Sequence, residues 1–150
     1  MNVIWHDLEC GGYAEDLPLW RELADREGDP VLDVGAGTGR VALDLARRGH
    51  SVTALDRDRE LLAELQRRAA GLPVRAVIAD ARDFRLEQRF ALCVVPMQTI
   101  QLLGGPAGRA GLLRCVRAQL APGGLVAVAL AEQLETYDSA GDWLAPLPDM

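Results

Sequence analysis

The fold is decided by the stretch VLDVGAGTGR at residues 31–40. Its first four residues, preceded by a proline, predict a buried strand, and its glycines predict a tight turn into a helix. Glycines at such a junction let a ligand touch bare backbone, and free N–H groups at the start of the next helix favour a carboxylate. In an open α/β sheet this junction is where ligands bind. The stretch therefore predicts a ligand site as well as a strand–turn–helix unit.

Strands and helices alternate along the rest of the chain. Short β-branched runs separated by helices of 10 to 15 residues are typical of βαβ units. We therefore expect an α/β protein with a Rossmann-like, open, mostly parallel sheet of about five strands and helices on both faces. Strands are predicted at residues 30–34, 51–55, 73–78, 90–95 and 125–130, helices at about 14–27, 38–48, 58–70 and 107–120, and a turn at Pro122-Gly123-Gly124.

Two parts of the chain differ in pattern. Residues 1–131 are expected to form the ligand-binding core, which includes an N-terminal helical lead-in. Residues 132–150 lack a convincing helix or strand period and are predicted to be an irregular tail that leads toward a missing C-terminal segment.

Composition restricts the class of protein. The 150 residues suit one domain, and the net charge of −6 argues against a large nucleic-acid footprint, which needs a basic face. The longest apolar run, Phe90 to Met97, is too short to span a membrane. Asp7 and Glu9 lie where a signal peptide needs apolar residues, so a cytoplasmic location is expected.

Cysteine and histidine are few and scattered. Cys10, Cys93 and Cys115 form no Cys-x-x-Cys pair, so neither a disulfide framework nor a zinc site is expected. His6 and His50 lie far apart in the sequence. We predict no metal site.

The spacing of the glycines restricts the ligand. The dinucleotide fingerprint Gly-x-Gly-x-x-Gly would place its third glycine at position 40, where this chain has Arg40. The pattern is instead Gly-x-Gly-x-Gly, preceded on the strand by Asp33. Asp56 ends the next strand, where a carboxylate can accept both ribose hydroxyls. Asp80-Ala81 ends the third strand, where the edge of an adenine could be recognised.

These residues resemble the class I S-adenosylmethionine-dependent methyltransferase family. The family's first three motifs resemble Leu32 to Gly39, Asp56 and Asp80-Ala81, and a later signature resembles Leu120 to Gly124. The lead-in at residues 12–17 is also similar to that of small bacterial members, so the resemblance covers about residues 10–131. It implies methyl transfer from S-adenosylmethionine, with S-adenosylhomocysteine as product, to a small-molecule or protein acceptor.

The resemblance also implies which residues bind the cofactor. The glycines would pass under its methionine part, which Tyr13 would cover, and Asp33 would help to hold its ammonium group. Asp56 would bind the ribose and Asp80 the adenine amine, with residues 96–98 near the sulfonium or the adenine. The expected cofactor-binding set is Tyr13, Asp33, Gly35, Ala36, Gly37, Gly39, Asp56, Arg57, Asp80, Ala81, Pro96, Met97 and Gln98.

The chain departs from the family in two places. Ala91 stands where members often carry an acid, and we assign no catalytic residue. We expect the family's last two strands to be missing from this sequence, which would leave an exposed fifth-strand edge for residues 132–150 or a second copy of the chain, as a homodimer, to cover. A non-catalytic cofactor-binding module or an inactive truncated core is therefore an alternative. An NAD-linked oxidoreductase is a further one, which Arg40 disfavours.

Overall fold

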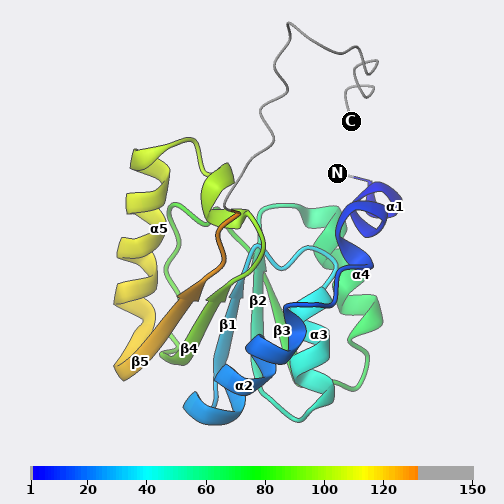
Figure 1. Ribbon diagram of the computed structural model, residues 1–150, viewed down its shortest axis with the longest axis horizontal. Helices are drawn as coiled ribbons and strands as arrows, with labels where there is room; N and C mark the ends of the chain where they lie inside the picture. Colours follow the sequence, from blue (N-terminus) through cyan, green and yellow to red (C-terminus); the bar gives the residue numbers. More distant parts are fainter. Residues whose placement is uncertain (1, 132–150) are drawn as a thin grey trace, which may run out of the picture.

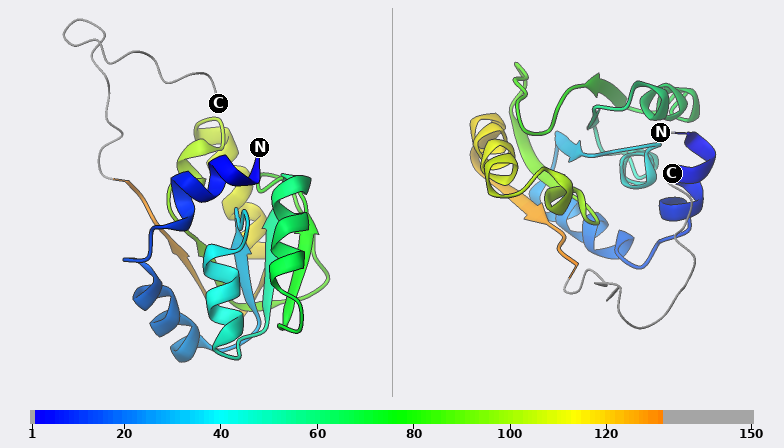
Figure 2. Two further views of the ribbon diagram at one scale, coloured as in Figure 1. Left: turned by 90° about the vertical axis from the view of Figure 1, so that its right-hand side faces the viewer. Right: turned by 90° about the horizontal axis from the view of Figure 1, so that it is seen from above.

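The computed structural model describes residues 2–131, which form one layered α/β unit (Figures 1 and 2). The expected open parallel sheet with helices on both faces is confirmed. None of the helices in residues 2–131 is long and apolar enough to cross a bilayer. The elements are α1 (Val3–His6), η1 (Asp7–Gly11), α2 (Leu17–Glu27), β1 (Val31–Val34), α3 (Arg40–Arg47), β2 (Val52–Asp56), α4 (Arg59–Arg68), β3 (Val74–Ile78), β4 (Phe90–Val95), η2 (Thr99–Leu102), α5 (Pro106–Gln119) and β5 (Leu120–Val128).

The sheet has the strand order β3-β2-β1-β4-β5, and all four pairs of neighbours are parallel. The order reverses between β1 and β4, because the chain runs outward from β1 to β3 and then returns to the other side of β1. A reversal of this kind opens a crevice at the carboxyl ends of the strands. The glycine turn after β1 lies at that crevice.

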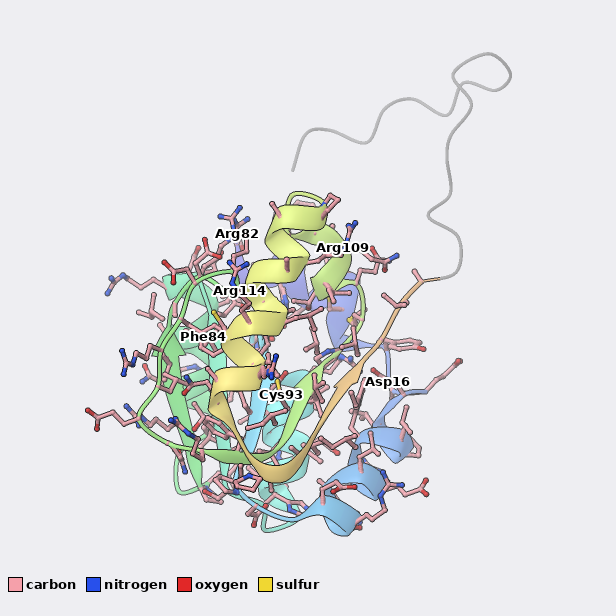
Figure 3. The ribbon with its side chains drawn as sticks, turned by 90° about the vertical axis from the view of Figure 1, so that its left-hand side faces the viewer. Asp16, Arg82, Phe84, Cys93, Arg109 and Arg114 are labelled. Carbon is pink, nitrogen blue, oxygen red and sulfur yellow. The ribbon has the colours of Figure 1, made fainter. Side chains whose placement is uncertain are left out.

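Each face of the sheet is packed against helices. On one face, α2, α3 and α4 cover a core that includes the fully buried Leu45 and Leu65. On the other face, α5 packs through Leu112 against a core that includes Phe84 and Cys93 (Figure 3). Burial on both faces explains why the central strands are mostly apolar, with Asp33 of β1 as a buried exception.

The lead-in differs from its prediction. Helix α2 begins at Leu17, not near residue 14, with Asp16 before it and Pro18 in its first turn, where a proline is tolerated. Before it the chain forms a short helix, α1, and a π-helical turn, η1, neither of which was predicted. Both lie at the end of the sheet where the glycine turn lies (Figures 1 and 2).

The predicted turn before the last strand is a bulge inside it. Strand β5 starts at Leu120, and its register shifts because Phe90 pairs with Leu120 whereas Leu92 pairs with Leu125. Gly123 takes a left-handed conformation, φ 77°, which absorbs the extra residues. The irregular tail predicted at residues 132–150 lies outside the described residues, and the division of the chain at residue 131 stays a prediction.

Candidate functional site

A cavity of about 590 Å³ opens at the carboxyl ends of β1, β2, β3 and β4. This volume lies within the range of small-molecule sites, about 300–1,000 Å³. Most of the residues expected from the sequence line it: Asp33, Gly35, Ala36, Asp56, Arg57, Asp80, Ala81, Pro96, Met97 and Gln98. The expected residues that do not line it are Tyr13, Gly37 and Gly39.

The glycine turn is packed too closely to carry side chains. A Cβ on Gly35 would lie 2.6 Å from Oγ1 of Thr99, and both Gly35 and Gly37 have positive φ angles, 75° and 56°. A Cβ on Gly37 would meet the ring of His6 from α1. Both positions therefore require glycine, for close approach and for backbone conformation.

The turn is joined to the acid at the end of β2. Oδ2 of Asp56 accepts a hydrogen bond of 2.9 Å from the amide of Gly37, and Oδ1 accepts one of 2.9 Å from the amide of Asp58. These two amides fix the plane of the carboxylate at the cavity wall. Lone pairs that the amides leave unused can accept hydroxyl donors from a ligand.

Asp33 is a buried carboxylate without a partner. Its side chain is 1% exposed, and neither of its oxygens has a hydrogen-bond partner of normal geometry in the described residues. Burial raises the pKa of Asp33 to about 7, although the charge of Arg40 and the nearby Ala42 amide oppose the rise. Because an unsatisfied buried carboxylate is costly, Asp33 is suited to receive a cationic or N–H donor group from a ligand in the cavity.

Asp80 already has a partner on its own loop. Its carboxylate accepts hydrogen bonds from the guanidinium of Arg82, the shortest 2.7 Å, and from the amide of Arg82 at 2.9 Å. These hydrogen bonds lower the pKa of Asp80 to about 2. The carboxylate is therefore charged, and an adenine amine would have to share it with Arg82.

Arg40 holds the lead-in, residues 3–16, against the glycine turn. Its guanidinium forms a bidentate pair with Asp16, and both side chains are nearly buried, at 10% and 14% exposure. The same guanidinium donates to the backbone oxygen of Tyr13 and lies 5.4 Å from the centre of that ring. Tyr13 is therefore stacked on Arg40 outside the cavity wall. Burial raises the pKa of Asp16, but its hydrogen bonds from Arg40 and Trp20 outweigh this and lower it overall.

A second ionic contact holds the start of the lead-in. Asp7 accepts a hydrogen bond of 2.8 Å from the hydroxyl of Thr38 and one of 2.6 Å from Arg68 of α4. The hydrogen bond from Arg68 is the main reason that the pKa of Asp7 is lowered to about 2. Residues 3–16 are thus attached at both ends to the glycine turn and the helices beside it.

Because the lead-in is attached to the glycine turn, three residues that the sequence did not predict there lie in the cavity wall. His6, Glu9 and Cys10 line the cavity although they lie more than 20 residues before the glycine turn. Their spacing of three and four residues puts them on one face of α1 and η1. A segment this short has too few residues for a helical period to show in the sequence.

The fourth strand leads into a strained residue. Met97 has a φ of 55°, and it is the residue other than glycine with positive φ in the described part of the chain. The strain is worth about 1–3 kcal/mol and is common at ligand sites. Beyond it, Oγ1 of Thr99 donates to the backbone oxygen of Pro96 at 3.0 Å and places η2 against the turn.

Comparison with known proteins gives a consistent result. Residues 31–124 match a family model described as a methyltransferase domain. A probable cobalt-precorrin-6B C(15)-methyltransferase of Methanothermobacter thermautotrophicus is 36% identical over 126 residues, which are 81% of this chain and 62% of that protein. The cypemycin N-terminal methyltransferase of a Streptomyces species is 31% identical over 77% of this chain and 47% of its own length.

Solved structures show the same likeness. The glycopeptide N-methyltransferase MtfA, complexed with S-adenosylmethionine, superposes with a TM-score of 0.69 and 34% identity over 81% of this chain and 57% of its own length. The chain thus spans between 47% and 62% of the length of these three relatives.

Proposed function

Since the chain belongs to the class I S-adenosylmethionine-dependent methyltransferases, we propose that it binds S-adenosylmethionine in the cavity and transfers the methyl group to a small-molecule or protein acceptor. The observation that carries this proposal is the buried, unpartnered carboxylate of Asp33 at the cavity wall. A ligand with an ammonium group would satisfy it. S-adenosylmethionine carries an ammonium group, and a phosphate-bearing dinucleotide carries none in the corresponding part.

The remaining wall fits the same ligand. Asp56 presents an oriented carboxylate for ribose hydroxyls, and Asp80 with the Ala81 backbone lies where the adenine edge would be recognised. The glycine turn offers bare backbone to the methionine part. The structure and the family thus favour the methyltransferase over an NAD-linked oxidoreductase. The position of the third glycine in a dinucleotide-binding turn is occupied here by Arg40, which is paired with Asp16. When bound, the cofactor supplies a methyl group made electrophilic by a positively charged sulfur.

The protein's own task is binding and alignment. Gly35 and its neighbours would support one end of the ligand and Asp56 would hold its middle, while Met97 and Thr99 form the wall beyond β4. An acceptor that enters between this wall and the lead-in would be held in line with the methyl group, which is catalysis by proximity. No residue is assigned as a catalytic base.

The acceptor is proposed to be a small molecule or a protein rather than a nucleic acid. Among residues 2–131, five carboxylates line the cavity against three arginines: Glu9, Asp33, Asp56, Asp58 and Asp80 against Arg40, Arg57 and Arg82. A wall with this balance disfavours the phosphates of a nucleic acid. The precorrin, cypemycin and glycopeptide enzymes among the relatives match 77–81% of the chain, whereas the ribosomal RNA methyltransferases match 55% or less, which supports the same choice.

The fifth strand supports a proposal about assembly. Within residues 2–131, β5 pairs with β4 and forms the outer edge of the sheet. Its residues 124–129 are only partly buried. We keep the proposal that a second copy of the chain covers this edge, which size measurement in solution would test. The cytoplasmic location stays a prediction.

Calorimetric titration with S-adenosylhomocysteine tests the proposed function. We expect micromolar binding by the 150-residue chain, a loss of at least about tenfold in Asp33→Asn, and no change in the control Asp83→Asn, an exposed residue outside the cavity. Absence of binding to the folded wild-type chain would contradict the proposal. Binding without any methyl transfer would favour the non-catalytic alternative.

A further inference from the structure

Two of the five carboxylates that line the cavity, Asp33 and Glu9, have no hydrogen bond of normal geometry and no ion pair within residues 2–131. The other three are engaged: Asp56 and Asp58 accept backbone amides, and Asp80 is paired with its neighbouring arginine. The two unpartnered acids are therefore the ones that remain for ligands.

Asp33 and Glu9 occupy different depths. Asp33 is 1% exposed and lies at the end of β1, on the floor of the cavity. Glu9 is exposed and comes from η1, the π-helical turn of the lead-in. A ligand that reaches the floor first would satisfy Asp33 and leave Glu9 facing whatever enters from solvent. Turns of this kind are frequent at functional sites.

We propose that Glu9 receives the methyl acceptor at the mouth of the cavity, and that this acceptor is an amine. The inference rests on the proposed function, because it requires the cofactor at the floor. A carboxylate accepts hydrogen bonds and attracts positive charge, so it favours an amine or ammonium group over an alcohol of the same shape.

The neighbours of Glu9 leave its charge available. Arg40, an arginine of the same cavity wall, is paired with Asp16. Burial raises the pKa of the Cys10 thiol above its ordinary value, so the thiol stays uncharged at neutral pH and is a poor competitor for the methyl group. The carboxylate of Glu9 is thus free to bind a cation.

The amine must react as the neutral base. Its nitrogen lone pair would form the bond to the methyl carbon while the carbon–sulfur bond breaks, and that bond's electron pair stays with the sulfur. The methylated nitrogen then carries the positive charge and loses a proton to water. Glu9 is a positioning and specificity residue in this scheme, since it holds the N–H groups and takes no part in bond making.

Paired probes test the inference. With the chain saturated by S-adenosylhomocysteine, ligand-detected NMR would measure the dissociation constants of benzylamine and benzyl alcohol, which differ in the amine. We expect wild type to prefer the amine by about tenfold, and Glu9→Gln to reduce this preference to about twofold or less. Glu15→Gln removes the same charge from an exposed residue of the lead-in outside the cavity wall, and it should keep the preference.

The outcomes separate this inference from the proposed function. Equal binding of amine and alcohol by wild type, or an unchanged preference in Glu9→Gln, would overturn it while binding of S-adenosylhomocysteine persists. A loss of affinity for S-adenosylhomocysteine in Glu9→Gln would also overturn it, because Glu9 would then serve the cofactor's ammonium group. Failure of S-adenosylhomocysteine to bind wild type would instead remove the proposed function.

Discussion

The amide of Gly37 donates a hydrogen bond of 2.9 Å to Oδ2 of Asp56, so the turn after β1 and the acid that ends β2 hold each other in place. The two residues lie on neighbouring strand ends of a parallel sheet. The close backbone turn and the ligand-facing carboxylate are therefore one structural unit, and a change in either should be felt at the other.

Asp56→Asn should weaken binding of S-adenosylhomocysteine by about 10- to 100-fold. The asparagine amide group would put a donor against the amide of Gly37 or of Asp58, and it would lose an acceptor for the ribose. Calorimetry would measure the change. Asp83→Asn, outside the cavity, is the control and should bind as wild type does.

Asp33 should make the stability of the ligand-free protein depend on pH. Its pKa is about 7 in the folded chain, against about 3.9 when unfolded, so the folded state holds the extra proton between these values. Stability should therefore fall as the pH rises from about 4 to 7, with a penalty of at most about 4 kcal/mol that is complete above pH 7.

Chemical unfolding of Asp33→Asn and wild type at pH 5 and pH 8 would check this. The unfolding free energy of the variant minus that of wild type should be about 2–4 kcal/mol larger at pH 8 than at pH 5, because asparagine does not titrate. A difference that is the same at both pH values would show that Asp33 does not titrate in this range.

Arg40→Ala should destabilise the chain by about 2–3 kcal/mol, because it leaves Asp16 nearly buried without its bidentate partner. The lead-in would loosen, and the affinity for S-adenosylhomocysteine would fall with it. The matched control is Arg67→Ala, whose side chain is 72% exposed and paired along one helix with Glu64. It should cost about 0.5 kcal/mol or less. Equal losses in the two variants would contradict a special role for Arg40.

Gly37→Ala should lower the free energy of unfolding by more than backbone strain alone would, because the added Cβ would overlap the ring of His6. Gly49 also has a positive φ, 95°, but has open space around it, so Gly49→Ala measures the strain alone, about 1–2 kcal/mol. The double variant Gly37→Ala with His6→Ala should recover part of the extra loss. Unfolding free energies of the variants would reveal whether the lead-in contacts the turn as described.

Much of the site could be predicted from the sequence because its parts are local. Each strand end and the residue that follows it are neighbours in the chain, so Gly35, Asp56 and Asp80 were placed at the carboxyl edge by pattern alone. Parallel strands then bring those ends together without further information. The bulge at Gly123 was missed because a turn and a bulge use the same residues, and only pairing with β4 distinguishes them.

The sequence by itself determined the order of the elements, the glycine turn and the acids that follow the strands, since these depend on short-range periodicity and on backbone conformations that only glycine adopts readily. Tertiary structure alone decided that His6, Glu9 and Cys10 enter the cavity wall. It also decided that Asp33 finds no partner within residues 2–131 and that Arg40 holds Asp16. The reason is physical: burial and ion pairing depend on which distant segments meet, and that information is not carried by any one stretch of the chain.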